Sequence, residues 1–327
     1  MILTRAPLRI SLMGGGSDLP AFFEKEFGDV FSFTINKYVY LALSKPFNDE
    51  IRLSYSRTEI VRSVGQIVHP LFRESLLEIG PDENIEIGSF ADVPSSGTGL
   101  GSSSSFTVAL LAGLLKFQER KFSAAQIAEL ACKIEITRCG DPIGKQDQYS
   151  SAIGGFNRFR FESDGTVGIA PVEITPESRT KLLRGFYLIY LGFGRSPNKI
   201  LETQTFNLQN SKLAVENTRL IRDMVDETIA ATLNSDLHGL GNLLDKAWAL
   251  KKQLSVGIST DRIDDYYEKF KTWGASGGKL LGAGGGGFLF MIVPEENQES
   301  FRTELSKSPF KVLPIDFDFD GVKVQGF

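Results

Sequence analysis

The sequence predicts an α+β fold built from two domains. Helical and strand patterns are mixed along the chain, without the regular strand–helix alternation that a doubly wound sheet requires. The pattern changes near residue 180, and beyond it three long helical segments fill residues 199–272. We therefore expect an N-terminal domain over residues 1–180 and a C-terminal domain over residues 181–327.

The N-terminal half carries most of the predicted strands. Aromatic and β-branched residues at near-alternating positions predict strands over residues 8–13, 31–43, 51–55, 85–90 and 156–161. Apolar residues at helical spacing predict helices over residues 68–79, 102–117 and 123–138. The second of these helices is apolar on nearly all sides and should be buried, and Ser123 is a suitable N-cap for the third.

The C-terminal half begins with a continuous apolar strand at residues 186–191 and contains a second one at residues 288–293. The three helical segments lie between these strands. After them we expect a helix over residues 297–306 and short strands near Val312 and Val322. The chain shows no internal repeat and no low-complexity linker.

The composition is that of an ordinary globular protein. The chain has 327 residues and a net charge of −4, with no lysine and arginine block that would mark a nucleic-acid partner. No apolar run reaches roughly 18 residues and the N-terminus is too interrupted for a signal peptide, so we expect no membrane partner and a cytoplasmic monomer or homodimer. Cys132 and Cys139 should be reduced thiols, and the two histidines offer no zinc-ligand spacing.

A glycine- and serine-rich loop at residues 92–105 is the most informative segment. It follows a predicted strand and opens the buried helix. Gly97, Gly99 and Gly101 allow a ligand to approach the backbone, and the helix N-terminus behind them offers free N–H groups and a partial positive charge. Four serines follow at positions 102–105, whereas a helix cap needs only one. Together these features predict a cradle for a polyphosphate.

Other nucleotide-binding motifs fit less well. No segment supplies the G-x-x-x-x-G-K-[ST] order of a Walker A loop. Residues 282–287 match G-x-G-x-x-G, but they lead into an apolar strand where a dinucleotide-binding loop leads into a helix. Residues 318–321 lack the D-F-G order of protein kinases.

Three motifs, in order, resemble those of the galactokinase–homoserine kinase–mevalonate kinase–phosphomevalonate kinase (GHMP) superfamily. They are residues 6–9 with 14–18 (APLR and GGGSD), residues 94–105 (PSSGTGLGSSSS) and residues 278–287 (GKLLGAGGGG). The resemblance implies an N-terminal domain like the second domain of ribosomal protein S5, a ferredoxin-like C-terminal domain and an active site between them. It also implies transfer of a phosphoryl group from ATP to a small molecule.

Details within these motifs resemble the D-glycero-D-manno-heptose 7-phosphate kinases. The matching segments are residues 5–9 (RAPLR), 14–19 (GGGSDL) and 144–149 (GKQDQY), followed by Gly154 and Gly155. This resemblance implies that the acceptor is a sugar phosphate. The reaction would be phosphorylation of the anomeric hydroxyl of a heptose 7-phosphate to the 1,7-bisphosphate.

The resemblance assigns ATP and magnesium to the serine-rich loop. The residues implied for the phosphates are Gly97, Gly99, Leu100, Gly101, Ser102, Ser103 and Ser104. Ser103 and Glu135 match the family's magnesium-binding serine and carboxylate, so ATP and Mg²⁺ are the expected cofactors. The residues alone allow Glu135 to be a solvated helix residue equally well.

The resemblance also implies a catalytic pair, Asp147 and Arg9. Asp147 matches the family's catalytic aspartate, which takes the acceptor proton or orients the hydroxyl, and Arg9 matches a basic residue near it. The simpler interpretations are an N-cap for Asp147 and a surface strand-edge position for Arg9. The tract from Gly140 to Asp147 is one residue longer than in mevalonate kinases.

The acceptor is expected at the two glycine-rich ends of the chain. The predicted substrate residues are Gly15, Gly16, Ser17, Asp18, Gly285 and Gly286. Asp18 matches the sugar-binding aspartate of galactokinases, and Gly15 and Gly16 replace their Glu-His pair, which suits a bulkier sugar. If the acceptor carries a phosphate, we expect Arg195 to bind it, and we place the weaker candidates Lys251 and Lys252 on a solvated helix face.

Three alternatives stay open. A non-catalytic sugar sensor on the same fold would be expected to lack Asp147 or Glu135, and both are present. A diphosphomevalonate decarboxylase would release carbon dioxide in place of a stable sugar phosphate. The third alternative is a kinase for a fucose-like sugar or for homoserine, although homoserine kinases usually lack the aspartate.

Overall fold

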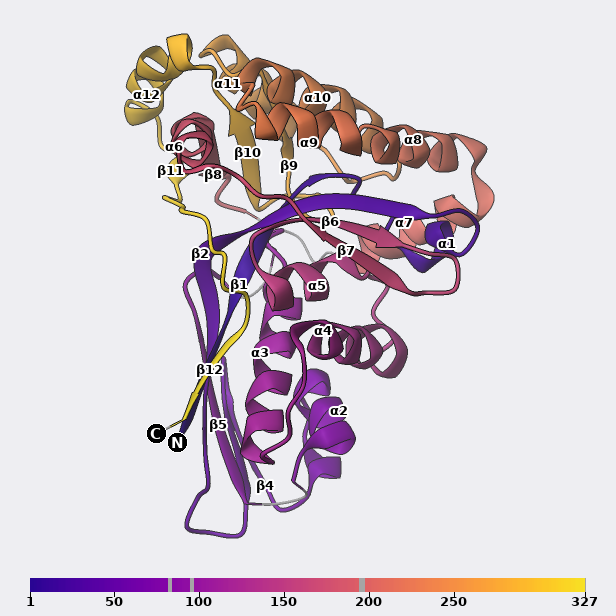
Figure 1. Cartoon of the computed structure of the whole chain (residues 1–327), viewed down its shortest axis with the longest axis vertical. Coiled ribbons are helices and arrows are strands. Elements are labelled where there is room, and N and C mark those ends of the chain that lie inside the picture. The colour runs from indigo at the N-terminus through magenta and orange to yellow at the C-terminus, as the bar shows by residue number, and fades with distance from the viewer. Residues whose placement is uncertain (82–83, 95–96, 194–197, 327) are drawn as a thin grey trace.

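Two β-sheets, one built mainly from each half of the chain, organise the fold (Figure 1). The computed structural model describes residues 1–81, 84–94, 97–193 and 198–326. Within these residues the first sheet has eight strands and the second has four. The predicted α+β class is confirmed, because the strands and helices do not form repeating strand–helix units.

The first sheet is built on a long hairpin of β1 and β2. Its strands are β1 (Ile2–Met13), β2 (Gly28–Ser44), β3 (Ile51–Ser54), β4 (Thr58–Val61), β5 (Ile85–Ala91), β6 (Phe156–Phe161), β7 (Val167–Pro171) and β12 (Lys323–Gly326). The order is β12-β1-β2-β5-β3-β4, and β6 joins β2 to β7. Only the β3–β5 pair among these described strands is parallel. Because β2 has 17 residues, it pairs with β5 along one half and with β6 along the other.

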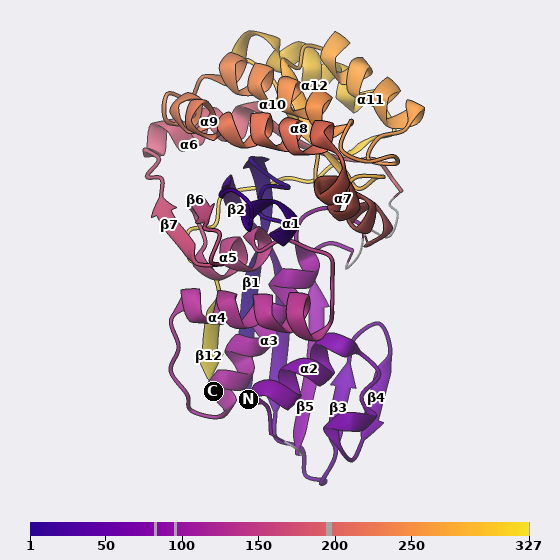
Figure 2. The same ribbon diagram turned by 90° about the vertical axis from the view of Figure 1, so that its right-hand side faces the viewer.

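Helices of the N-terminal half cover one face of this sheet (Figure 2). They are α2 (Pro70–Ile79), α3 (Ser102–Phe117), α4 (Ala124–Cys132) and α5 (Gln146–Ile153), with a 3₁₀ turn at Val64–Gln66. The short helix α1 (Pro20–Phe23) packs instead against helix α7 (Asn198–Asn210) of the C-terminal half. α3 packs on β1 and β2 and is buried along most of its length, as its apolar sequence predicts. The helix predicted over residues 123–138 changes into a π-helical turn at Lys133–Arg138, and this turn carries Glu135.

The second sheet and its helices form the C-terminal half. Its antiparallel strands, in the order β11-β8-β10-β9, are β8 (Phe186–Tyr190), β9 (Gly277–Leu280), β10 (Phe288–Ile292) and β11 (Lys311–Val312). The helices are α6 (Pro176–Gly185), α7 (Asn198–Asn210), α8 (Lys212–Asp223), α9 (Val225–Leu233), α10 (Leu237–Lys251), α11 (Asp261–Thr272) and α12 (Gln298–Ser306), with a 3₁₀ turn at Glu295–Asn297. The three predicted helical segments are divided into five helices, because Ser211, Asp236 and Thr260 each cap a new one.

A shared aromatic core joins the two halves of the chain. Phe33 of β2 stacks on Phe186 of β8 with ring centroids 5.8 Å apart, and it meets Phe317 edge-on at 5.3 Å. Phe186 in turn packs edge-on against Phe290 of β10 at 5.0 Å. All four rings are buried. The helices α8, α9 and α10 also contact β1 or β2, so the ends of the first sheet are covered by the C-terminal half.

The C-terminal segment returns to the first sheet. β12 pairs antiparallel with β1, and the two termini lie side by side (Figure 1). On the way, the N–H of Asn36 donates to the carbonyl oxygen of Asp316 at 2.8 Å, and Thr34 Oγ1 donates to that of Asp318 at 2.8 Å. The strand expected near Val322 therefore belongs to the N-terminal sheet. The domain boundary near residue 180 stays a prediction.

Candidate active site

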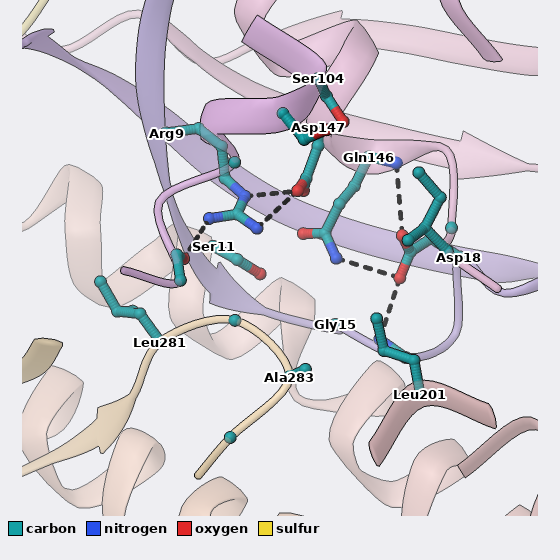
Figure 3. A pocket seen from close by; sticks show the side chains of 18 of the residues that line it. Arg9, Ser11, Gly15, Asp18, Ser104, Gln146, Asp147, Leu201, Leu281 and Ala283 are labelled. Atoms are coloured by element: carbon teal, nitrogen blue, oxygen red, sulfur yellow. Dashed lines mark hydrogen bonds and ion pairs between the residues drawn. The ribbon is translucent and has the colours of Figure 1, made fainter. Parts of the chain in front are cut away.

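A cavity of about 340 Å³ lies where the two halves of the chain meet (Figure 3). It adjoins the serine loop (residues 97–104) and the glycine tract (residues 282–287). The predicted site residues that line it are Arg9, Gly15, Gly16, Asp18, Gly97, Gly99, Gly101, Ser102, Ser103, Ser104, Asp147 and Gly286. Residues from all three sequence motifs therefore line one cavity.

The serine loop and the glycine tract pack backbone against backbone. Gly99 has φ +77° and Gly282 has φ +70°, values that favour glycine. A Cβ on Gly99 would lie 2.3 Å from the carbonyl oxygen of Leu281, and one on Gly282 would lie 2.5 Å from Cα of Gly99. A Cβ on Gly287 would lie 2.6 Å from the carbonyl oxygen of Gly97. Side chains at these positions would push the two loops apart.

The serine loop leads into the first turn of α3. Gly101 has φ +75° and directly precedes the helix. Ser103 is exposed, whereas Ser102 and Ser104 are buried, and all three line the cavity. The first N–H groups of a helix have no partner within it and carry a partial positive charge. The start of α3 thus offers hydroxyl and N–H donors to an anion.

Arg9 and Asp147 form a bidentate ion pair on the wall of the cavity (Figure 3). Arg9 Nε donates to Asp147 Oδ1 at 2.7 Å, and Arg9 Nη2 donates to Asp147 Oδ2 at 2.8 Å. Arg9 Nη1 also donates to the carbonyl oxygen of Gly99 at 2.6 Å, and the Arg9 N–H donates to that of Leu100 at 3.1 Å. Arg9 is 4% exposed, so the surface strand-edge interpretation is wrong. The side chain of Leu100 is buried in the core.

Asp147 lies in the first turn of α5, with its side chain 23% exposed. A Cβ on Gly101 would lie 3.2 Å from Asp147 Oδ2, so the carboxylate sits beside the start of α3. The N-cap of α5 is Lys145, which forms no side-chain capping bond. Both carboxylate oxygens of Asp147 point at Arg9, which explains their position better than a capping role does.

Asp18 is buried behind the first glycine motif and also lines the cavity. Its Oδ1 accepts the N–H of Gly16 at 2.9 Å and Nε2 of Gln146 at 3.1 Å, and its Oδ2 accepts the N–H of Gln146 at 3.3 Å. A Cβ on Gly144 would lie 2.0 Å from Oδ2 of Asp18, so the close approach requires glycine there. Burial raises the pKa of Asp18, and the Asp147 carboxylate adds to this rise.

Two side chains outside the predicted site add polar atoms to this wall. Ser11 Oγ and Gln146 Oε1 are buried and have no hydrogen-bond partner among the described residues. Both residues line the cavity, and a Cβ on Gly15 would lie 3.1 Å from Ser11 Oγ. Buried polar atoms of this kind call for a ligand or a water as partner. Ser11 follows Arg9 by two positions on the same strand, so the alternation of strand side chains was the available signal.

Two lysines of the C-terminal half also line the cavity. Lys251, the last residue of α10, donates to the carbonyl oxygens of Leu280 at 3.2 Å and Gly282 at 2.6 Å. Lys279 of β9 donates to the carbonyl oxygen of Leu12 at 3.2 Å. The expectation that Lys251 belongs to a solvated helix face is therefore wrong, because the helix ends against the glycine tract and directs this side chain inward.

Glu135 is fully buried next to the start of α3. Its Oε2 accepts Ser104 Oγ at 2.7 Å and the side-chain amide of Gln148, and its Oε1 accepts Thr107 Oγ1 at 2.5 Å. Burial raises the pKa of Glu135 to about 7, against the opposing effect of these hydrogen bonds. The solvated-helix interpretation is wrong. The role of Glu135 as a magnesium ligand stays a prediction, and Ser104 is the residue that links it to the cavity.

The raised pKa of Glu135 predicts a measurable pH dependence of stability. The folded protein holds this proton up to about pH 7, whereas the unfolded chain releases it near the ordinary value of 4.5. The stabilising contribution is complete below that value and is lost as the pH rises through about 7. Glu135→Gln cannot ionise, so we expect its free energy of unfolding relative to that of the wild type to rise by about 2.5 kcal/mol from pH 5 to pH 8.

Urea unfolding of both proteins at these two pH values measures this difference. Glu173→Gln changes an exposed glutamate and serves as the control, for which the difference from the wild type should not vary with pH. A pH-independent difference for Glu135→Gln would show that the buried carboxyl does not titrate in this range.

Three predicted acceptor residues lie off the cavity wall or outside the described residues. The hydroxyl of Ser17 donates to the carbonyl oxygen of Gly14 at 2.7 Å, and Ser17 is fully buried. The N–H of Gly285 donates to the carbonyl oxygen of Ile258 at 3.0 Å, which leaves this N–H engaged within the protein. Arg195 lies outside the described residues. The part that these residues take in substrate binding stays a prediction.

Family models match both halves of the chain. The model described as GHMP kinases N terminal domain matches residues 60–155, and the one described as GHMP kinases C terminal matches residues 228–311. The chain belongs to the GHMP kinase family. The prediction of a phosphotransferase with an alcohol group as acceptor is thereby confirmed.

Relatives of this GHMP kinase cover nearly its whole length. The D-glycero-alpha-D-manno-heptose 7-phosphate kinase of Campylobacter jejuni is 29% identical over 98% of this chain and 98% of its own. The bifunctional fucokinase/GDP-fucose pyrophosphorylase of Arabidopsis thaliana is 25% identical over 92% of this chain, which spans only 31% of that protein. The crystal structure of a D-glycero-D-manno-heptose 1-phosphate kinase from Bacteroides thetaiotaomicron has the same fold, with a TM-score of 0.82 at 24% identity, and covers 100% of this chain and 99% of its own. In the described parts of this GHMP kinase, no helix is both long and apolar enough to span a bilayer.

Proposed function

We propose that this GHMP kinase transfers the γ-phosphoryl group of ATP to the anomeric hydroxyl of D-glycero-D-manno-heptose 7-phosphate, forming the 1,7-bisphosphate. The observation that carries the proposal is the position of Asp147, paired with Arg9 on the cavity wall beside the start of α3. A carboxylate there can accept the proton of a hydroxyl that attacks a phosphate held by the serine loop. The choice of sugar follows the name of the Campylobacter jejuni relative.

The serine loop is the proposed holder of the β- and γ-phosphates. Gly97, Gly99 and Gly101 have positive φ values and no side chains, so the backbone is open to a ligand. Ser102 and Ser103 add hydroxyl donors at the N-terminus of α3, where the helix carries a partial positive charge. A polyphosphate is the anion that matches this extended row of donors.

Ser103 and Glu135 are the proposed protein ligands of Mg²⁺. Ser103 is exposed and lines the cavity, and Glu135 accepts a hydrogen bond from Ser104, which lines the same wall. Both supply oxygen, which Mg²⁺ prefers, and the buried Glu135 has no cation among the described residues to balance its charge. Bound there, the ion would neutralise negative charge on the phosphates.

In the transfer step, the bond between the γ-phosphorus and the β–γ bridging oxygen breaks as a bond forms between the phosphorus and the acceptor oxygen. Asp147 would receive the acceptor proton. As the carboxylate becomes neutral, the guanidinium of Arg9 would be free to balance charge on the phosphoryl oxygens. Because Arg9 is anchored to Gly99, this pair is held in place before a substrate arrives.

The sugar is proposed to bind between the first glycine motif and the glycine tract. Gly15 and Gly16 line this part of the cavity and, having no side chains, leave room there for a bulky ring. Asp18, Gln146 and Ser11 place side-chain oxygens beside them, and two of these oxygens lack a partner among the described residues. Sugar hydroxyls both donate and accept hydrogen bonds, so they suit such a wall.

A kinase for a fucose-like sugar is the second candidate, and the Arabidopsis thaliana relative supports it. The substrates of the two candidate functions differ in charge, because heptose 7-phosphate carries a phosphate group and fucose does not. A non-catalytic sensor has less support, since Asp147 and Arg9 are in contact and line the cavity.

A screen of ATP consumption tests the proposal. The acceptors are heptose 7-phosphate, the unphosphorylated heptose, fucose, galactose, mevalonate and homoserine, each with ATP and Mg²⁺. We expect heptose 7-phosphate to raise turnover at least about 100-fold above the background ATPase rate, with ³¹P NMR showing a new phosphate on the anomeric carbon. Turnover with fucose alone would favour the second candidate, and an unchanged rate with every sugar would overturn both.

A further inference from the structure

Lys251 and Lys279 bring two cations from the C-terminal half into the cavity. Lys279 is only 5% exposed and makes one hydrogen bond, to the carbonyl oxygen of Leu12. Lys251 reaches two carbonyl oxygens, those of Leu280 and Gly282. Neither lysine forms an ion pair with any residue that the structure describes. An ammonium group has three N–H donors, so both side chains retain donors for a ligand.

The other charged side chains that line the cavity are Arg9, Asp18, Asp141 and Asp147. Asp147 is already neutralised by Arg9, through both of its oxygens. The negative charge of Asp18 raises the pKa of both lysines, but Asp18 forms no ion pair with either of them. Its oxygens accept hydrogen bonds from Gly16 and Gln146. Asp141 is partly buried, and burial raises its pKa. The two lysines therefore form a cationic patch without a carboxylate partner.

In this patch the charged forms of both lysines are disfavoured. Burial and the nearby Arg9 together lower the pKa of Lys251 to about 8, against an opposing effect of Asp18. Burial also lowers the pKa of Lys279 to well below its usual value, with Lys251 and Arg9 adding to the effect. Isolated buried cations are unfavourable, and the same groups become favourable when an anion lies between them. Such perturbed groups in a cavity are typical of ligand sites.

We propose that Lys251 and Lys279 form a phosphate-binding subsite that the C-terminal half contributes to the acceptor pocket. The proposal rests on the proposed kinase function and gives these lysines the task expected of Arg195. Lys279 reaches β1 at Leu12, three residues before Gly15, so the subsite adjoins the proposed sugar position. A phosphate bound there would connect the two halves of the chain across the cavity.

Two phosphoryl groups have the chemistry for this subsite: the one that a sugar phosphate already carries and the one that leaves ATP. Both present oxygen anions to the ammonium groups. They differ in their kinetic consequence. Loss of contact with the phosphate of the sugar raises the KM of that sugar alone, whereas loss of contact with the transferred group lowers kcat for every acceptor.

Binding of inorganic phosphate tests the subsite without relying on catalysis. Wild type, Lys279→Met and Lys246→Met would be melted with ADP and Mg²⁺ present, in increasing phosphate at constant ionic strength. Lys246 is exposed on α10 and is the matched control. We expect Lys279→Met to melt roughly 3 °C or more above the wild type without phosphate, because the cost of burying an amine without an anion partner is removed. It should also lose at least about half of the rise in Tm that phosphate produces in the other two proteins.

Lys251→Met is the second variant and should lose the phosphate response in the same way. An equal phosphate response in the wild type, Lys279→Met and Lys251→Met would overturn the subsite. This outcome is independent of whether the protein phosphorylates any sugar.

Steady-state kinetics with heptose 7-phosphate and the unphosphorylated heptose separate the two sources of phosphate. If the subsite holds the phosphate of the sugar, Lys279→Met raises the KM of heptose 7-phosphate about 10- to 100-fold and leaves kcat/KM for the free heptose within about twofold. If it holds the transferred group, kcat falls with both acceptors. Wild-type kinetics of Lys279→Met with both acceptors would overturn the subsite and leave the kinase proposal intact.

Discussion

Replacing Asp147 by asparagine is expected to lower kcat at least about 10²-fold while the protein stays folded. The amide cannot accept the acceptor proton, so this assistance is lost from the transition state. The amide oxygen can still accept one hydrogen bond from Arg9, which now makes bonds of 2.7 and 2.8 Å to the carboxylate. ATP binding should therefore change little, because the serine loop is untouched.

ATP consumption with the best acceptor measures kcat, and nucleotide titration of the same variant measures ATP affinity. Asp265→Asn changes an exposed aspartate on α11 and should retain the wild-type rate. A rate for Asp147→Asn within about tenfold of the wild type would remove this carboxylate from the mechanism.

Gly99→Ala is expected to separate the serine loop from the glycine tract. The new Cβ would lie 2.3 Å from the carbonyl oxygen of Leu281, and neither backbone can move without the other, because Gly282 packs on Gly99 in return. The residue also has φ +77°, which alanine rarely adopts. We expect a loss of about 3 kcal/mol or more in the free energy of unfolding and at least about a tenfold loss in ATP affinity.

Gly165→Ala separates the effect of the positive φ from the effect of the close contact between the two loops. Gly165 has a similar φ of +85°, but a Cβ there would meet only Lys145 Nζ, at an ordinary distance of 3.8 Å. This variant should lose about 1 kcal/mol and keep its ATP affinity. Urea unfolding and nucleotide titration measure both effects. If Gly99→Ala behaves like Gly165→Ala, the contact between the two loops is not what requires glycine.

Much of the fold could be predicted because the signals are local. The buried helix at α3 follows from its apolar residues, and the hairpin strands follow from their alternation. The pairing of β12 with β1 could not be predicted, because its partner lies at the other end of the chain. The helix boundaries also differ from the predicted ones where a side chain caps a new helix inside a continuous helical pattern, as Ser211 does at the start of α8.

The candidate site was predictable only in part. The glycines and serines of the loops have a local signature, and most of those predicted for the site line the cavity, although Ser17 and Gly285 do not. Lys251 and Lys279 carry no such signature, because a lysine is usually solvated and only packing can bury its charge. Gln146 was missed for the same reason, since nothing in its neighbours shows that a cavity faces it. Ser11 could have been inferred from its alternation with Arg9 on β1.

By itself, the sequence determined the motifs and their order, since positive φ at glycine, donors at a helix start and an apolar strand are properties of neighbouring residues. Only the tertiary structure decided which charges meet. It pairs Arg9 with Asp147, which lies 138 residues away in the sequence. It surrounds the carboxyl group of Glu135 with three hydrogen-bond donors, and it buries Lys279 without a carboxylate partner. The interaction between two charges depends on their distance and on the water between them, and both are set when distant segments pack together.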